Sequence, residues 1–135
     1  MALFEKLANY KDTGILLMRL GLGFMMITHG LPKLIAGPET WTNIGSSMGL
    51  WGIHFAPVFW GFMAATAEGI GGVLVILGLF FRPACLLIMI TMAVAATHHF
   101  SAGEGLKGAG HALEIGFAFL GLLFIGPGKY SVDKK

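Results

Sequence analysis

Charged residues are scarce in this sequence: they make up 12% of its 135 residues, whereas hydrophobic residues make up 56%. Soluble domains carry about 25% charged residues, so the composition excludes an ordinary soluble domain and indicates one integral membrane domain over residues 1–135. The net charge is only +2 and the basic residues are dispersed, which argues against a nucleic-acid-binding surface. We therefore expect the lipid bilayer, and no nucleic acid, as a partner.

Cysteine is nearly absent as well. Cys85 is the only one, which excludes an intrachain disulfide and a Cys-x-x-Cys redox pair. The phosphate-binding pattern GxxxxGK[ST] does not occur, so a nucleotide site of that kind is excluded. The eight methionines are typical of gap-filling in an apolar core rather than of a copper site. We expect no metal site and no intrinsic cofactor.

Long apolar runs are what the sequence does contain. They predict four transmembrane helices, at about residues 14–35, 56–81, 84–100 and 111–126, because about 20 apolar residues cross the hydrocarbon core. The connection over residues 37–55 is rich in Gly, Ser and Thr and carries Trp41 and Trp51. We expect an interfacial or re-entrant loop with its tryptophans at headgroup level. The predicted fold is an all-α, four-helix transmembrane bundle.

Basic residues are unevenly distributed between the two ends of these spans. The side with both termini holds six, namely Lys6, Lys11, Arg82, Lys129, Lys134 and Lys135, and the other side holds two, Lys33 and Lys107. Cytoplasmic connections of membrane proteins carry the excess of Lys and Arg. The bias predicts that both termini are cytoplasmic.

A single acid interrupts the second predicted span near its middle. Glu68 is surrounded by small residues, namely Gly61, Ala64, Ala65, Gly69, Gly71 and Gly72. Such residues allow close helix packing in lipid, so Glu68 is expected on a packed interface. An ionised carboxylate in the hydrocarbon core is costly unless it is paired, solvated or protonated. Two hypotheses follow: Glu68 is a functional acid, or it is a side chain that only joins helices.

Other polar side chains lie in the same spans. Residues at spacings of four and three form a polar, small face on the first predicted helix, namely Arg19, Gly23, Met26, Gly30 and Lys33. From a rise of about 1.5 Å per residue, we expect His29 nearest to Glu68, with Arg19 deeper and balancing its charge. The predicted catalytic residues are Glu68 and Arg19.

The later spans add polar groups at similar spacing. One stripe holds Cys85, Met89, Met92, Ala96 and His99, and another holds His111, Glu114, Ala118, Gly121 and Ile125. His111 and Glu114 are three residues apart, a spacing that helical bundles use for metal-binding or hydrogen-bonded pairs. The predicted ligand-binding residues of an intramembrane pocket are His29, Lys33, His99, His111 and Glu114.

The order of short motifs along the chain resembles one known family. Arg19-Leu-Gly-Leu-Gly-Phe and His29-Gly-Leu-Pro-Lys33 precede Glu68-Gly-Ile-Gly-Gly72, Gly78-Leu-Phe-Phe-Arg82-Pro-Ala and Gly126-Pro-Gly-Lys-Tyr-Ser-Val-Asp133. Taken together, from about residue 14 to residue 133, these motifs resemble the DoxX family.

The resemblance implies a four-helix, multi-pass protein of the bacterial cytoplasmic (inner) membrane. Members are associated with quinone-linked or thiosulfate oxidation and with oxidative stress. On this basis we expect a membrane component of a redox system that binds a quinone or another small ligand near Glu68. Redox proteins and a second copy of the chain are candidate partners. The alternative is a non-enzymatic scaffold or a bundle that conducts a small solute, and the sequence leaves open whether the protein is an enzyme.

Overall fold

The computed structural model describes residues 3–133, and its regular elements in that range are all helices. The four long ones are α1 (Lys11–Ala36), α3 (Pro57–Leu77), α4 (Phe81–Ser101) and α5 (Gly105–Ile125). Three short ones are η1 (Glu5–Tyr10), α2 (Pro38–Gly45) and η2 (Ser46–Trp51). The all-α prediction is confirmed. Lys134 and Lys135, which were counted for the charge bias, lie outside the described residues.

The four long helices are long and apolar enough to cross a membrane, the first of them together with η1. Their boundaries differ from the predicted ones, most of all at the end of α3 and at the start of α5. α3 ends at Leu77, because Gly78 adopts a left-handed φ of 67°, a conformation that commonly ends helices. α4 then begins at Phe81 and holds Pro83 in its first turn, where proline is tolerated. α5 begins at Gly105, earlier than predicted.

The connection between the first two spans is helical rather than an irregular loop. α2 and η2 both pack against α3, and η2 also contacts α4. Glycines allow this close approach. A Cβ on Gly45 would overlap the carbonyl oxygen of Pro57, and a Cβ on Gly61 would overlap that of Trp41. The segment therefore covers the end of the molecule at which α3 begins.

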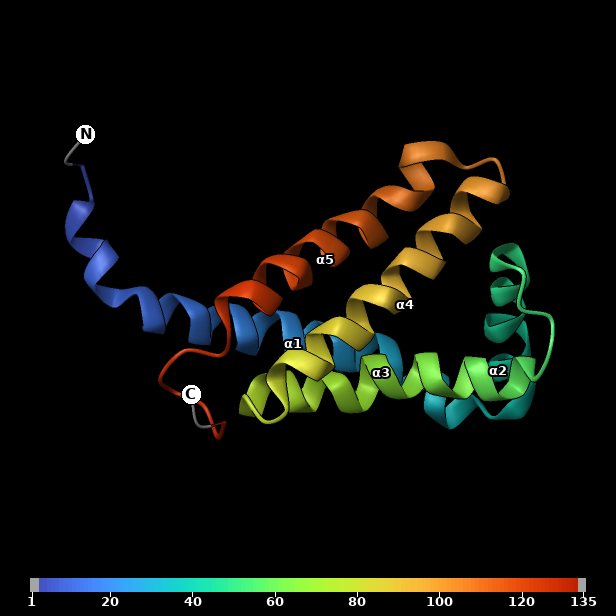
Figure 1. Ribbon diagram of the computed structural model, residues 1–135, viewed down its shortest axis with the longest axis horizontal. Coiled ribbons are helices and arrows are strands. Elements are labelled where there is room, and N and C mark those ends of the chain that lie inside the picture. Colours follow the sequence, from blue (N-terminus) through green and yellow to red (C-terminus); the bar gives the residue numbers. More distant parts are fainter. Residues whose placement is uncertain (1–2, 134–135) are drawn as a thin grey trace.

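The long helices form two pairs (Figure 1). α1 lies beside α3 and α5 lies beside α4, while α3 and α4 are joined by a short turn. From that turn the two pairs diverge, and α2 lies at the opposite, open end. Within the described chain, α1 and α5 do not pack against each other. The transmembrane helices thus form an open arrangement, with both termini near the end opposite α2 (Figure 1).

Glycines bring α1 and α3 into backbone contact. A Cβ on Gly30 would overlap the backbone nitrogen of Gly69, and one on Gly23 would lie 2.7 Å from the carbonyl oxygen of Gly72. In lipid, helix association depends on such close contacts because no water is expelled from between the helices. The predicted small-residue face around Glu68 is therefore confirmed.

This contact predicts that Gly30→Ala lowers the unfolding temperature of the protein in mild detergent. The added methyl group has no room, and overpacking costs about 1–3 kcal/mol. Gly21→Ala on the same helix is the matched control, because a Cβ there meets no atom within 4 Å. It should leave the unfolding temperature unchanged or slightly raised. Equal unfolding temperatures for the two variants would contradict the importance of the contact.

Candidate functional site

Glu68 lies on α3 beside the contact with α1, and its side chain is 4% exposed. Its Oε2 accepts a hydrogen bond of 2.7 Å from Nζ of Lys33, in the last turn of α1. The prediction that His29 is the nearest partner is wrong. Lys33 lies one turn further along α1, but its long side chain reaches back to the acid. Glu68 is therefore a paired carboxylate, which is the condition for tolerating a charge at this depth.

Trp41 of α2 holds the backbone at Lys33. Its indole N–H donates to the carbonyl oxygen of Lys33 at 2.8 Å. The last carbonyls of a helix lack an intrahelical donor, so this bond satisfies one of them. The indole also packs edge-on against Phe62 of α3, with ring centroids 5.0 Å apart. Trp41 therefore helps to position Lys33, the basic member of the ion pair. This role comes in addition to the membrane anchoring that is expected of a tryptophan.

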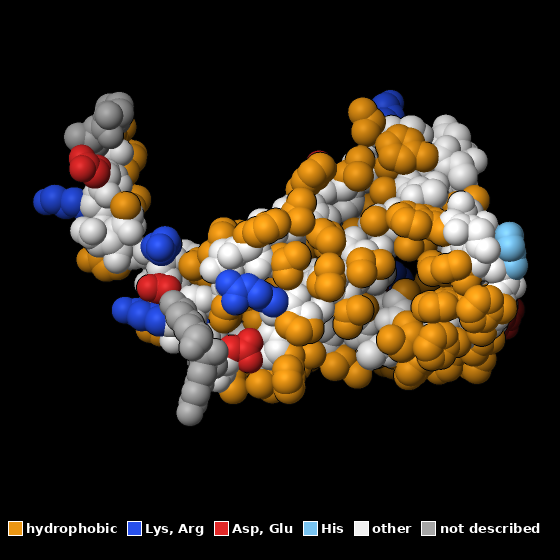
Figure 2. Space-filling view, in the orientation of Figure 1, with side chains coloured by type: hydrophobic (Ala, Val, Ile, Leu, Met, Phe, Trp, Pro, Cys, Tyr) orange, Lys and Arg blue, Asp and Glu red, His pale blue; other side chains and the backbone are white. Residues whose placement is uncertain are grey.

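A cavity of about 480 Å³ lies between α3, α4 and the α2–η2 segment. Its lining is mainly apolar and includes Met63, Ala64 and Val94, while Lys33 and Glu68 form a polar part of the wall. Figure 2 shows a hollow between α3 and α4 with a basic group inside it, and Lys33 is the one Lys or Arg among the described lining residues. This size and lining are typical of small-molecule sites.

A second cavity of about 150 Å³ extends between α1, α4 and α5. It shares Lys33, Glu68 and His99 with the larger cavity. His29 and His111 also line it, and their ring centroids are 5.5 Å apart. The structure therefore brings four predicted ligand-binding residues together around Glu68.

Two hydrogen bonds lie at the rim of the larger cavity. Nδ1 of His99 lies 3.1 Å from Oε2 of Glu104, and Nδ1 of His98 lies 3.2 Å from Oγ of Ser47. Ser47 and His98 were not among the predicted site residues, because the sequence did not show that η2 would pack against α4. Within residues 3–133, no group of three or more His, Cys, Asp or Glu side chains is arranged to hold a metal ion.

Ser47 belongs to a Gly-x-Ser-x-Gly pattern over residues 45–49. In hydrolases this pattern exposes the serine at a strand-to-helix turn, whereas here it lies at the end of α2 and on η2. Within the described chain, no carboxylate is hydrogen-bonded to His98 to orient the imidazole. Ser47 therefore lacks both the strand-to-helix turn and the carboxylate-oriented histidine of a serine hydrolase site.

Arg19 lies away from the ion pair, toward the other end of α3. Its guanidinium donates four hydrogen bonds, and the acceptors are the carbonyl oxygens of Val75, Ile76, Pro127 and Tyr130, at 2.6 to 3.1 Å. Val75 is seven residues beyond Glu68, which corresponds to about 10 Å along a helix. The prediction that Arg19 balances the charge of Glu68 is therefore wrong. Arg19 instead joins α1, α3 and the C-terminal segment.

Two carboxylates hold the same segment. Both oxygens of Asp133 accept hydrogen bonds of 2.8 Å, from the backbone N–H groups of Phe80 and Phe81 at the start of α4. Such N–H groups have no partner inside the helix. Asp12 near the start of α1 accepts a bond of 3.1 Å from the backbone N–H of Lys129. The C-terminal segment thus closes this end of the molecule.

Glu114 lines neither cavity, and its side chain is exposed. α5 packs through Ala112, Phe119 and Leu122, which belong to the apolar core. This rotation turns Glu114 outward, while His111 stays at the edge of the smaller cavity. The prediction that Glu114 reaches the pocket is therefore wrong.

The part of the chain that builds the ion pair also carries its family signature. A family model described as DoxX matches residues 14–101, more than half of the chain. The chain belongs to the DoxX family. The DoxX match contains Lys33 and Glu68, and α5 lies outside it. An uncharacterized protein of Haemophilus influenzae is 29% identical over 137 residues, covering 97% of this chain and 96% of that protein. No solved structure shows a significant match.

The contacts of Arg19 predict a structural role. Arg19→Gln should lower the unfolding temperature and speed tryptic cleavage after Lys129, because buried carbonyls lose their donor at about 1–3 kcal/mol each. Lys33→Gln is the control: it breaks the ion pair but leaves the C-terminal contacts intact. Limited proteolysis followed by mass spectrometry measures the difference. Cleavage of Arg19→Gln at the wild-type rate would contradict the assignment.

Proposed function

We propose that this DoxX-family protein binds a quinone-like molecule at the Lys33–Glu68 ion pair, as the membrane component of a redox or oxidative-stress system. The observation that carries the proposal is the ion pair in the wall of a largely apolar cavity of about 480 Å³. A cavity of this kind suits a ligand with an apolar body and a small polar head. Quinones have this form and dissolve in the hydrocarbon core.

The polar groups match the chemistry of a quinone head. Its two carbonyl oxygens accept hydrogen bonds, and an ammonium group has three donors, of which Lys33 directs one to Glu68. His99 borders the same space and supplies a further ring nitrogen. In this proposal a redox partner protein supplies two electrons, and the quinone takes up two protons to become a quinol. Glu68 takes each proton from water and passes it to a carbonyl oxygen of the head group.

The proposal includes a location in the bacterial cytoplasmic membrane with both termini in the cytoplasm. Figure 2 supports this orientation, because most of the visible Lys and Arg side chains gather at the end that carries the termini. Such an excess of basic residues is typical of the cytoplasmic side. The ion pair then lies nearer the outer surface than Arg19 does.

A bundle that conducts a proton or a small solute is the second candidate. The two cavities favour it, because both are lined by Lys33, Glu68 and His99. Ionisable groups between two intramembrane cavities are typical of conduction pathways. The remaining alternative is a scaffold without a ligand. It does not account for the two cavities.

The first test of the proposal is ligand binding. Purified protein in mild detergent should bind a short-chain ubiquinone analogue saturably, with quenching of tryptophan fluorescence as the readout, because Trp60 lines the cavity. Ala64→Phe fills the cavity and should weaken binding by about tenfold or more, a loss of about 1.4 kcal/mol. Val73→Phe, at an exposed position of α3, is the matched control and should bind as the wild type does. Absence of saturable binding by the wild type would refute the proposal.

The second test addresses the proton. Glu68→Gln keeps the shape of the side chain but cannot exchange a proton, so it should bind the analogue yet fail to restore growth of a deletion strain under oxidative or thiosulfate stress. Its unfolding temperature is measured in parallel, because loss of the partner of Lys33 also affects stability. A folded variant that restores growth fully would remove Glu68 from the mechanism.

A further inference from the structure

One strip of α5 carries polar and small residues on the outside of the molecule. Its members recur at spacings of four and three residues, and they are Lys107, His111, Glu114, Ala118, Gly121 and Ile125. All are exposed except Ala118, which is partly buried. We call this set the α5 outer strip. The spacing is typical of a helix that packs along another helix. In a single copy α5 packs on α4, and of the strip only His111 has an aromatic contact with another helix, through His29 of α1.

Glu114 makes this exposure costly. It lies near the middle of α5, a helix of 21 residues that could cross the membrane. It takes part in no ion pair or hydrogen bond among residues 3–133. A carboxylate at such a depth facing acyl chains is strongly disfavoured, and intramembrane acids almost always face protein or water. In the membrane, Glu114 on this strip therefore needs contact with water or with polar groups of another protein chain.

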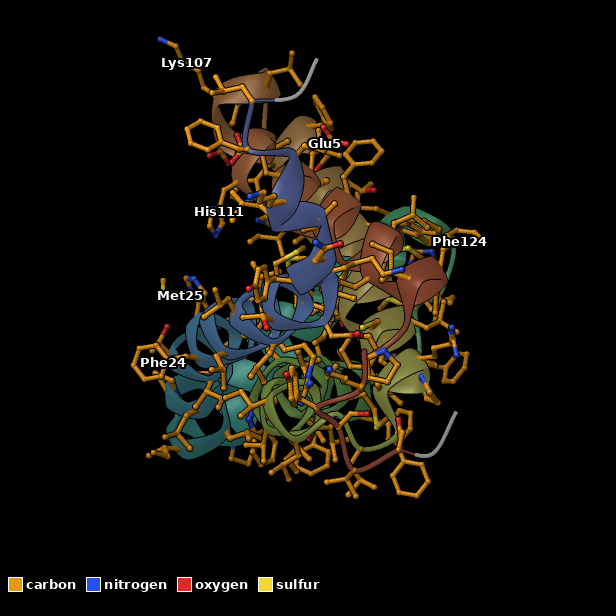
Figure 3. All side chains as sticks on the ribbon, turned by 90° about the vertical axis from the view of Figure 1, so that its left-hand side faces the viewer. Glu5, Phe24, Met25, Lys107, His111 and Phe124 are labelled. Carbon is orange, nitrogen blue, oxygen red and sulfur yellow. The ribbon has the colours of Figure 1, made fainter. Side chains whose placement is uncertain are left out.

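The neighbouring side of α5 is also open. α1 does not pack against α5, and Figure 3 shows His111 of α5 and Met25 of α1 facing each other across a space that is empty in this view. His29 and His111 border the smaller cavity at this place. A partner on the α5 outer strip would lie next to this opening.

We propose that a second copy of this chain packs on the α5 outer strip, with Glu114 of each copy paired to His111 of the other. The two residues lie three positions apart, on the two flanks of the strip. A twofold axis along the membrane normal places opposite flanks of two identical helices across from each other. The acid of one copy then meets the imidazole of the other at nearly the same depth.

The residues next to the pair permit this contact. Ala118 is small, and a Cβ on Gly121 would meet no atom within 4 Å in a single copy. Small residues let two helices approach closely enough for hydrogen bonds between them. The strip is self-complementary because it carries both members of the pair, whereas acyl chains offer no hydrogen bond. The interface does not depend on quinone binding.

Disulfide crosslinking in native membranes tests the interface. With Cys85 replaced by Ala, the Ala118→Cys variant should form a crosslinked dimer under mild oxidation. Phe124→Cys is the matched control: Phe124 is 77% exposed on the same helix and points away from His111 in Figure 3. Crosslinking of Ala118→Cys alone supports the proposal. Equal crosslinking of both variants, or none of Ala118→Cys, would overturn it.

The Glu114–His111 contact between copies is tested by energy transfer between labelled copies in vesicles of increasing lipid-to-protein ratio. Glu114→Gln should weaken dimerisation by about 3- to 20-fold, the range measured for hydrogen bonds between membrane helices. Thr97→Val on α4 removes a polar group elsewhere, bonded only to the carbonyl of Ala93, and should leave dimerisation unchanged. Because Glu114 is exposed, its replacement should not unfold a single copy. Dimerisation of Glu114→Gln at wild-type strength would overturn the pairing.

Discussion

The backbone contact between α1 and α3 is the constraint on which the ion pair depends. Gly30 lies against the backbone of Glu68 and Gly69 with no room for a side chain. This separation lets Lys33, one turn further along, reach the carboxylate at 2.7 Å. Such a partner lowers the cost of a charge in the hydrocarbon core. The glycines of the two helices therefore determine the electrostatics of the site as well as its packing.

The two ends of the molecule differ in how tightly their segments are held together. At the end with the termini, Arg19, Asp12 and Asp133 bind the C-terminal segment across α1, α3 and α4. At the opposite end the helix pairs diverge, and the α2–η2 segment packs into the opening. The larger cavity lies there, and its lining is mainly apolar. One end is held together by hydrogen bonds to the C-terminal segment, and the other contains the cavity that could hold a ligand.

The sequence predicted much of this arrangement from spacing. The four spans, the small-residue face around Glu68, and the gathering of His29, Lys33, His99 and His111 all follow from helical periodicity and depth. Three assignments failed. Lys33, and not the predicted His29, is the partner of Glu68. Arg19 finds its polar partners in backbone carbonyls, and the packing of α5 turns Glu114 outward.

The sequence by itself determined that the chain is helical, that four segments suit a membrane, and which residues share a helix face, because these properties depend on local composition and period. Only the tertiary structure decided which way each face turns. The rotation of α5 is set by the packing of Phe119 and Leu122 against α4, and the partner of Glu68 is set by the separation of α1 and α3. Both depend on contacts between residues far apart in the chain, for which periodicity holds no information.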